Sequence, residues 1–133
     1  MSPEMSSLSI LGIRVHVAHM SQVLDLMETW IWEKGSCKYI VATGMHGIME
    51  AHKDPAFKDV LNSADILAPD GILAILTARF LGYRLSKQET GPDLLWRFSE
   101  TANKRGYTYF FLGDTERTLE QLSFNLTSAF PGI

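Results

Sequence analysis

The stretch ILAPDGILAIL, residues 66–76, decides the fold. Its first three residues are apolar, which predicts a short buried strand over residues 66–68. The Pro-Asp-Gly of residues 69–71 predicts a tight turn, because proline restricts the backbone and glycine lets other groups approach closely. An apolar run that favours a helix over residues 72–81 follows directly. This order is typical of the strand–turn–helix unit of an α/β domain.

Short apolar runs alternate with helical patterns along the rest of the chain. The expected strands are 8–17, as two short strands about Gly12, then 39–42, 66–68 and 107–112. The expected helices begin at the caps Ser21 and Asp54, after a turn over residues 43–47, and at residues 72, 91 and 115. Strands separated by helices predict an α/β domain with a mostly parallel sheet.

The domain organisation is simple. Residues 1–7 are small and polar and are expected to be a flexible N-terminus, whereas residues 8–133 are expected to form one domain. The last residues, Phe130-Pro131-Gly132-Ile133, follow a predicted helix, and such a Pro-Gly normally leads into another strand. We therefore expect the domain to be truncated at its C-terminus.

Composition excludes several functional classes. Hydrophobic residues make up 46% of the chain and charged residues 20%, as in soluble globular proteins. The net charge of −3 gives no basic surface for nucleic acid. No apolar run approaches the length of a membrane span, and the N-terminus lacks the features of a signal peptide. The single cysteine, Cys37, forms no internal disulfide and fits a reducing cytoplasm.

Polar and glycine residues gather in turns that follow predicted strands, where ligands of parallel sheets bind. In the first, Thr43 and Gly44 offer a hydroxyl and a bare backbone to a sugar or phosphate, and His46 offers an imidazole. In the second turn, Asp70 offers a carboxylate, and Gly71 lets a ligand approach the backbone closely. The alternatives stay open: Thr43 and Asp70 could be plain helix caps, and His46 plain polar surface.

Two further segments are weaker candidates for ligand contacts. Gly91 and Asp93 open a predicted helix, and Gly113 and Asp114 lie where a phosphate could meet a helix N-terminus. Neither segment carries a glycine-rich dinucleotide fingerprint or a Walker pattern. A metal site is not expected, because no cysteine or acidic pair accompanies the closely spaced His16 and His19.

Taken together, these segments resemble one family, the WecG/TagA/CpsF glycosyltransferases of bacteria, over residues 8–133. The segments that carry the resemblance are Leu11-Gly12-Ile13, Val41-Ala42-Thr43, Ala51–Phe57, Leu61–Asp65, Pro69-Asp70-Gly71, Gly91-Pro92-Asp93-Leu94, Tyr109–Gly113 and Phe130-Pro131-Gly132. The run from Asp54 to Gly71 is the most specific part.

The resemblance implies a Rossmann-like three-layer fold and an inverting transfer of N-acetylmannosamine, glucose or a similar sugar. The donor would be a UDP-sugar and the acceptor a polyprenyl-diphosphate-linked sugar, in the synthesis of teichoic acid or another cell-surface polysaccharide. Asp70 takes the place of the family's proposed general base, and Thr43 that of its threonine. The resemblance implies no metal or other cofactor. It implies a cytoplasmic protein at the inner face of the membrane, with peripheral membrane contact. An exposed apolar edge could also give a homo-oligomer.

The sequence departs from the family pattern at three positions. Met45 replaces a usual asparagine, Gln88 replaces a common arginine near the Gly91 turn, and Asp114 replaces a frequent second glycine. Loss of an arginine weakens contacts to phosphate. These departures leave open a degenerate module that binds a nucleotide-sugar or a partner chain without catalysis. A fragment of another Rossmann-like nucleotide binder, such as a dehydrogenase, is a weaker alternative, since the glycine fingerprint is absent.

Overall fold

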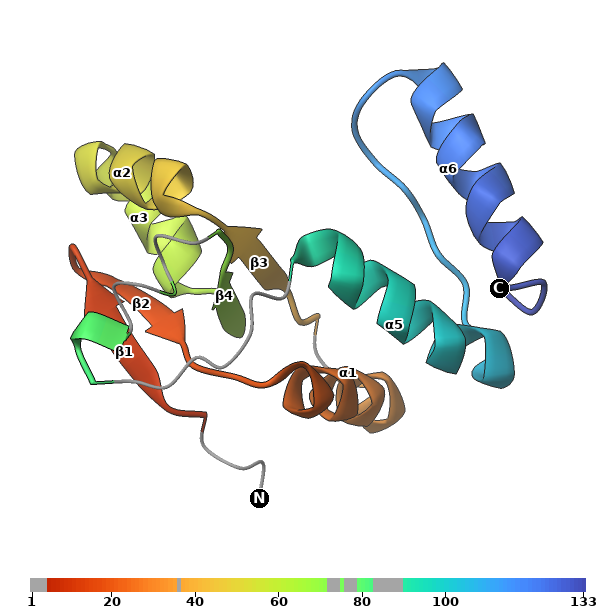
Figure 1. Cartoon of the computed structure of the whole chain (residues 1–133), viewed down its shortest axis with the longest axis horizontal. Coiled ribbons are helices and arrows are strands. Elements are labelled where there is room, and N and C mark those ends of the chain that lie inside the picture. Colours follow the sequence, from red (N-terminus) through yellow and green to blue (C-terminus); the bar gives the residue numbers. More distant parts are fainter. Residues whose placement is uncertain (1–4, 36, 72–74, 76–78, 83–89) are drawn as a thin grey trace. The chain divides into compact units, whose positions relative to one another are not determined.

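The structure is a computed structural model, and it describes residues 5–35, 37–71, 75, 79–82 and 90–133. The chain divides into two compact units, Met1–Gly91 and Pro92–Ile133, and each is described by itself (Figure 1). Most of the helix expected over residues 72–81, together with Gln88, lies outside the described residues.

The described strands of the first unit form two small sheets. β1 (Ser7–Ile10) and β2 (Ile13–His16) form an antiparallel hairpin, and β3 (Ile40–Thr43) and β4 (Ile66–Pro69) form a parallel pair. The prediction of a mostly parallel sheet is therefore only partly correct for the described strands. The hairpin is antiparallel because Leu11 and Gly12 both take a positive φ, 52° and 78°, which turns the chain back within two residues.

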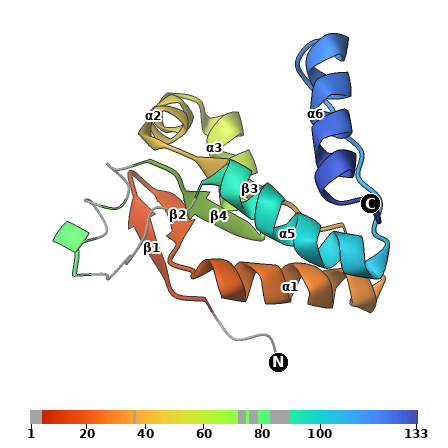
Figure 2. The same cartoon turned by 45° about the vertical axis from the view of Figure 1, so that its right-hand side comes forward.

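Helices accompany these strands, and the described residues give the bounds of three of them. They are α1 (Met20–Glu33), α2 (Met45–Lys53) and α3 (Pro55–Asn62). Helices α2 and α3 lie side by side in both views, and both contact β2 (Figure 2). The expected cap of α3 is confirmed, because Asp54 Oδ1 accepts hydrogen bonds from the backbone N–H groups of Ala56 and Phe57. The expected cap Ser21 is wrong, because α1 begins at Met20 and Ser21 lies inside it. The cap residue is His19, whose backbone N–H donates to Gln22 Oε1 at 3.0 Å.

An apolar core joins the described hairpin of the first unit to α2, α3 and β4. It combines one face of the hairpin with the inner faces of α2, α3 and β4. Its fully buried members include Ile13, Ile48 and Leu67, one from each of three elements. Because these positions are distant in sequence, the core fixes β4 against the hairpin and the helices.

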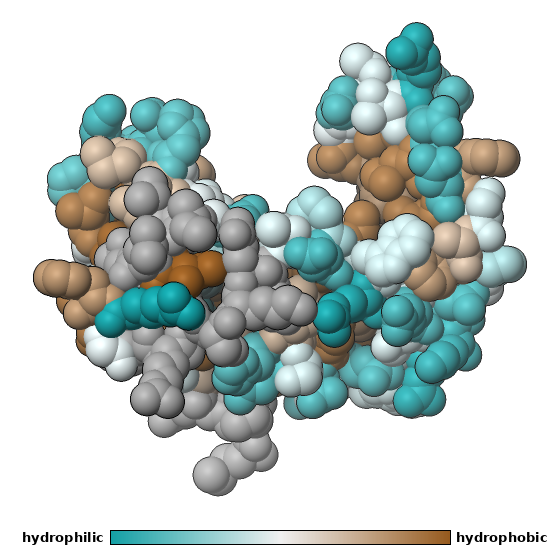
Figure 3. Space-filling view, viewed as in Figure 1, coloured by the Kyte–Doolittle hydropathy of each residue, from teal (hydrophilic) through white to brown (hydrophobic). Residues whose placement is uncertain are grey.

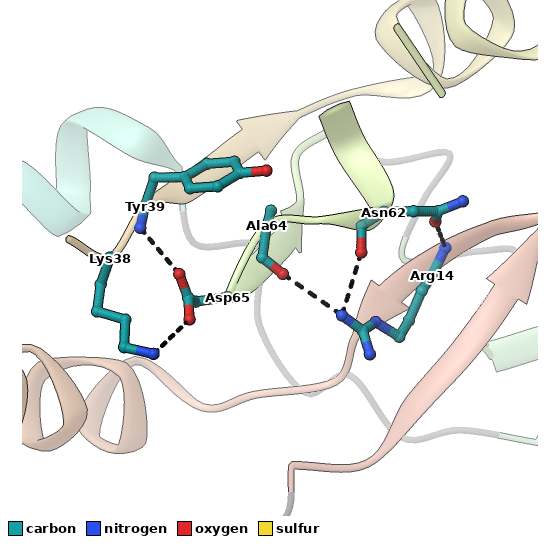
Figure 4. Close-up of polar contacts among 6 residues, drawn as sticks. All are labelled: Arg14, Lys38, Tyr39, Asn62, Ala64 and Asp65. Carbon is teal, nitrogen blue, oxygen red and sulfur yellow. Dashed lines mark hydrogen bonds and ion pairs between the residues drawn. The ribbon is translucent and has the colours of Figure 1, made fainter. Parts of the chain in front are cut away.

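Polar contacts fasten the hairpin to the junction between α3 and β4 (Figure 4). Asn62 Oδ1 accepts from the Arg14 N–H at 2.8 Å, and Asn62 Nδ2 donates to the Gly12 carbonyl at 3.1 Å. The Arg14 guanidinium donates to the carbonyls of Asn62 and Ala64. These bonds fix where β4 begins.

A second set of contacts aligns the starts of β3 and β4 (Figure 4). The carboxylate of Asp65 accepts from Lys38 Nζ at 2.9 Å and from the Tyr39 N–H at 3.1 Å. Desolvation opposes ionisation of Asp65, but the hydrogen bonds from Lys38 and Tyr39 outweigh it and lower the pKa of the carboxyl. Asp65 therefore sets the register of the parallel pair.

The side chain of His16, at the end of β2, bonds to the backbone of β4. Its imidazole is 7% exposed, and its Nδ1 accepts from the backbone N–H of Leu67 at 2.9 Å. Burial, and next the charge of Arg14, lower the pKa of His16. The imidazole must be neutral at Nδ1 to accept this bond.

This bond predicts a pH-dependent stability. Below about pH 6.5 the unfolded chain takes up a proton at His16 more readily than the folded chain, because the folded pKa is lower. The free energy of unfolding is therefore expected to fall as the pH drops below about 6.5, and to be independent of His16 above it. The check is urea unfolding from roughly pH 5 to pH 8. His16→Asn is expected to flatten this slope and the exposed-site control His52→Asn to keep it; equal slopes for all three proteins would refute the assignment.

The second unit contains α5, which begins at Gly91 and ends at Arg105, an extended segment, and α6 (Glu116–Ala129). Its aromatic contacts include Phe98 stacked on Tyr107, with ring centroids 6.2 Å apart, and Trp96 edge-on to Phe130 at 5.0 Å. The backbone N–H of Gly132 donates to Asn103 Oδ1 at 2.6 Å, which ties the last residues to α5.

The strand expected over residues 107–112 is wrong for the described structure. Half-buried and exposed side chains alternate along the segment, as in a strand, but no described segment pairs with it. A β-strand needs backbone hydrogen bonds to a neighbouring strand. The alternation of side chains along the sequence does not show whether such a neighbour is present.

Candidate functional site

The parallel pairing of β3 and β4 brings together two of the predicted site turns. Thr43 lies opposite Pro69 in the register, and the backbone N–H of Asp70 donates to the Thr43 carbonyl at 2.8 Å. A Cβ added to Gly44 would lie 3.2 Å from the Asp70 carbonyl oxygen. Thr43, Gly44 and Asp70 therefore meet at one rim of the parallel pair, as parallel strands require of residues at their carboxyl ends.

Gly44 is where β3 turns into α2. It is the N-cap residue of α2, with φ −89° and ψ −171°, and it provides no side-chain cap. The alternative that Thr43 caps α2 is wrong, because the Thr43 hydroxyl instead donates to the Gly44 carbonyl at 3.4 Å. Among the described residues, no side chain accepts from the first N–H groups of α2. These N–H groups can donate to an anionic ligand.

Asp70 follows β4 directly and is half-buried. Within the described residues its carboxylate makes no hydrogen bond or ion pair. Gly71 has φ +85°, in the region that favours glycine, and an added Cβ there would meet no atom within 4 Å. The chain thus presents a carboxylate next to open space.

Two neighbours on α2 differ in their surroundings. The side chain of His46 is exposed in the first turn. Met45 packs against the apolar core, which accounts physically for an apolar residue at a position where the resembled family has asparagine. The Met45 side chain anchors the start of α2, and it lacks the amide group that an asparagine would offer to a ligand.

Gly91 lies against the strand that carries Thr43. A Cβ added to Gly91 would be 3.4 Å from the Cβ of Ala42, so the chain passes β3 closely at this point. Gln88, which was predicted as a substrate contact just before this turn, lies outside the described residues.

The other candidates belong to the second unit. Asp93 is exposed in the first turn of α5. Gly113 and Asp114 take positive φ angles of 119° and 55°, and Asp114 Oδ1 accepts from the Thr115 N–H at 2.6 Å. Aspartate tolerates this left-handed region better than most residues, which explains how Asp114 can stand where the family often has glycine.

No three histidine, cysteine, aspartate or glutamate side chains gather as metal ligands in the described part of the chain. None of the helices in that part combines the length and apolar character needed to cross a membrane.

Sequence reasoning missed residues that shape this rim from outside it. Asn62 and Asp65 fasten β4 in place, and Gly47 lies against the side chain of Thr43. The sequence predicted Gly47 in the turn before the second helix, whereas α2 begins at Met45 and includes it, so no packing role was predicted for this glycine. Asn62 and Asp65 gave no local signal, because their partners lie 26 to 50 residues away.

Comparison with known proteins gives concordant matches. Residues 8–133 match the model of the family described as "Glycosyl transferase WecG/TagA/CpsF family". The chain is 25% identical over 116 residues to an N-acetylglucosaminyldiphosphoundecaprenol N-acetyl-beta-D-mannosaminyltransferase of Bacillus spizizenii. It is 29% identical over 116 residues to the enzyme of the same name from Bacillus subtilis. Both alignments cover 87% of this chain and 45% of the relative, so the chain spans about half the length of these relatives.

Proposed function

The chain belongs to the WecG/TagA/CpsF family of glycosyl transferases, and we propose that it transfers a sugar from a UDP-sugar to a polyprenyl-diphosphate-linked acceptor. N-acetylmannosamine is the proposed sugar, since the relatives are named as N-acetylmannosaminyltransferases. The product would serve the synthesis of a cell-wall or cell-surface polysaccharide. The complete domain is proposed to be Rossmann-like with three layers.

The observation that carries this proposal is the hydrogen bond between Asp70 and Thr43 at the rim of β3 and β4. An acceptor hydroxyl is a weak nucleophile until a base withdraws its proton during bond formation. The Asp70 carboxylate is proposed as that base, with no described partner competing for its oxygen atoms. Attack on the face opposite to the leaving UDP would invert the anomeric carbon.

The departing UDP carries negative charge that needs hydrogen-bond donors. The first N–H groups of α2, which follow Gly44, and the hydroxyl of Thr43 are proposed to contact the nucleotide-sugar. His46, Gly71, Gln88, Gly91, Asp93, Gly113 and Asp114 are proposed as further substrate contacts. Following the resemblance, the transfer is proposed to proceed without a metal.

The chemistry of the substrates suggests where the protein works. A UDP-sugar is a cytoplasmic metabolite, and a polyprenyl-diphosphate acceptor is held in the membrane. We propose that the protein acts in the cytoplasm at the inner face of the membrane, through peripheral contact.

Phe110 and Leu112 are 89% and 91% exposed, and apolar surface is visible on the second unit (Figure 3). Such exposed apolar side chains support self-association.

The proposal is tested by titrating the chain with UDP in a calorimeter and by measuring UDP release from UDP-N-acetylmannosamine. Binding of UDP is expected, and release of UDP is expected to depend on the lipid-linked N-acetylglucosamine acceptor. Absence of heat at millimolar UDP would contradict the proposal for this chain.

A second candidate is a binding module without catalysis. It is favoured by Met45 and Asp114, which stand where the family has other residues. Calorimetric binding of UDP without acceptor-dependent release would select this second candidate.

A further inference from the structure

Gly47 lies four residues after Thr43, within α2, and faces its side chain. A Cβ built on Gly47 would collide with Thr43 Oγ1, and it would lie 3.3 Å from Thr43 Cβ and 3.7 Å from Cγ2. The hydroxyl of Thr43 therefore occupies space that any other residue at position 47 would fill.

Backbone conformation does not explain this glycine. Gly47 lies inside α2 and is not among the glycines with positive φ, so its backbone is accessible to every L-amino acid. Helix propensity opposes it, because glycine is among the least favourable residues in a helix interior. The structural reason for this glycine is the close approach of the Thr43 side chain.

The consequence for Thr43 is steric. Its side chain has three staggered rotamers, and a neighbouring Cβ at position 47 would forbid the observed one. In the observed rotamer the hydroxyl also donates to the Gly44 carbonyl at 3.4 Å. A side chain at position 47 would rotate the hydroxyl out of this place or push α2 away from β3.

We propose that Gly47 is a positioning residue, whose missing side chain sets the rotamer of Thr43 and so the place of its hydroxyl on the rim shared with Asp70. The consequence for sugar transfer rests on the proposed function. The positioning itself rests only on the contact between Gly47 and Thr43.

A double-mutant cycle tests the positioning. Gly47→Ala is expected to lower the folding equilibrium constant about tenfold in the natural chain, as overpacking does. In the Thr43→Ala background the same change is expected to raise that constant about fivefold, the gain in helix propensity of alanine over glycine. An equal effect of Gly47→Ala in both backgrounds, measured by urea unfolding, would overturn the proposal.

Two further measurements separate positioning from mere stability. Three-bond couplings of Thr43 measured by NMR report its χ1 angle, which is expected to change in Gly47→Ala and to stay the same in the surface variant Met49→Ala. In the transfer assay, Gly47→Ala is expected to lower kcat more than it raises KM for the donor. An unchanged χ1 in folded Gly47→Ala would overturn the proposal, whereas a natural chain without transfer activity would refute only the proposed function.

Discussion

Replacing Asp70 by asparagine is expected to lower the rate of sugar transfer about 100- to 10,000-fold, the range that a general base contributes. Asparagine keeps the shape of aspartate but cannot take a proton from the acceptor hydroxyl. The fold should persist, because the Asp70 carboxylate has no described side-chain partner and the N–H that bonds Thr43 belongs to the backbone. UDP release in the presence of acceptor measures the effect.

The matched control for this variant is Asp59→Asn. Asp59 is exposed on α3, and only its backbone carbonyl has a described hydrogen bond. Its replacement also removes one negative charge from the first unit, so it reproduces the change in net charge. Transfer by Asp59→Asn should equal that of the natural chain. Full turnover by a folded Asp70→Asn would exclude Asp70 as the base.

Replacing Leu67 by alanine is expected to lower the free energy of unfolding by about 2–5 kcal/mol. Leu67 is 0% exposed in the middle of β4 and belongs to the core shared by the hairpin, α2 and α3. The change removes buried apolar surface and leaves a cavity that the surrounding strands and helices can fill only partly. Since the free energy of unfolding of a small domain is itself of similar size, a large fraction of the Leu67→Ala molecules is expected to be unfolded at room temperature.

Val60→Ala serves as the control for Leu67→Ala. Val60 is 53% exposed on α3, so its truncation should change the free energy of unfolding far less. Urea unfolding followed by circular dichroism measures both variants. Equal losses from the two changes would contradict the placement of Leu67 in the core.

Elements with a local signal could be predicted from the sequence. Asp54 and Pro55 specify the start of α3 within four residues of chain, and the structure confirms both. Gly12 marked the turn between β1 and β2 because a hairpin needs positive φ there. Such signals depend on backbone conformation and on neighbours along the chain, which a sequence displays directly.

Features that depend on distant partners could not be predicted in the same way. The alternation in residues 107–112 predicted a strand, but pairing depends on a second segment. His16 contributes an acceptor to the N–H of Leu67, 51 residues away, and nothing in its own surroundings along the chain indicates this role. Ser21 failed as a cap because His19 and Gln22 supply a competing arrangement.

The candidate site falls between these two cases. Thr43 and Asp70 could be placed together from the sequence, because the ends of parallel strands share one rim. The details that hold them there could not, since Asn62 and Asp65 act through bonds to residues far away in the chain. Gly47 was visible only as an unexplained glycine until its contact with Thr43 was known.

A nucleotide-sugar site at the rim of β3 and β4 is tested most directly by an NMR titration of the 15N-labelled chain with UDP. The amide signals of Thr43, Gly44, Asp70 and Gly71 are expected to shift together and to saturate with one binding constant. Shifts that spare these four amides, while other signals of the chain move and saturate, would contradict a nucleotide-sugar site at the rim of β3 and β4.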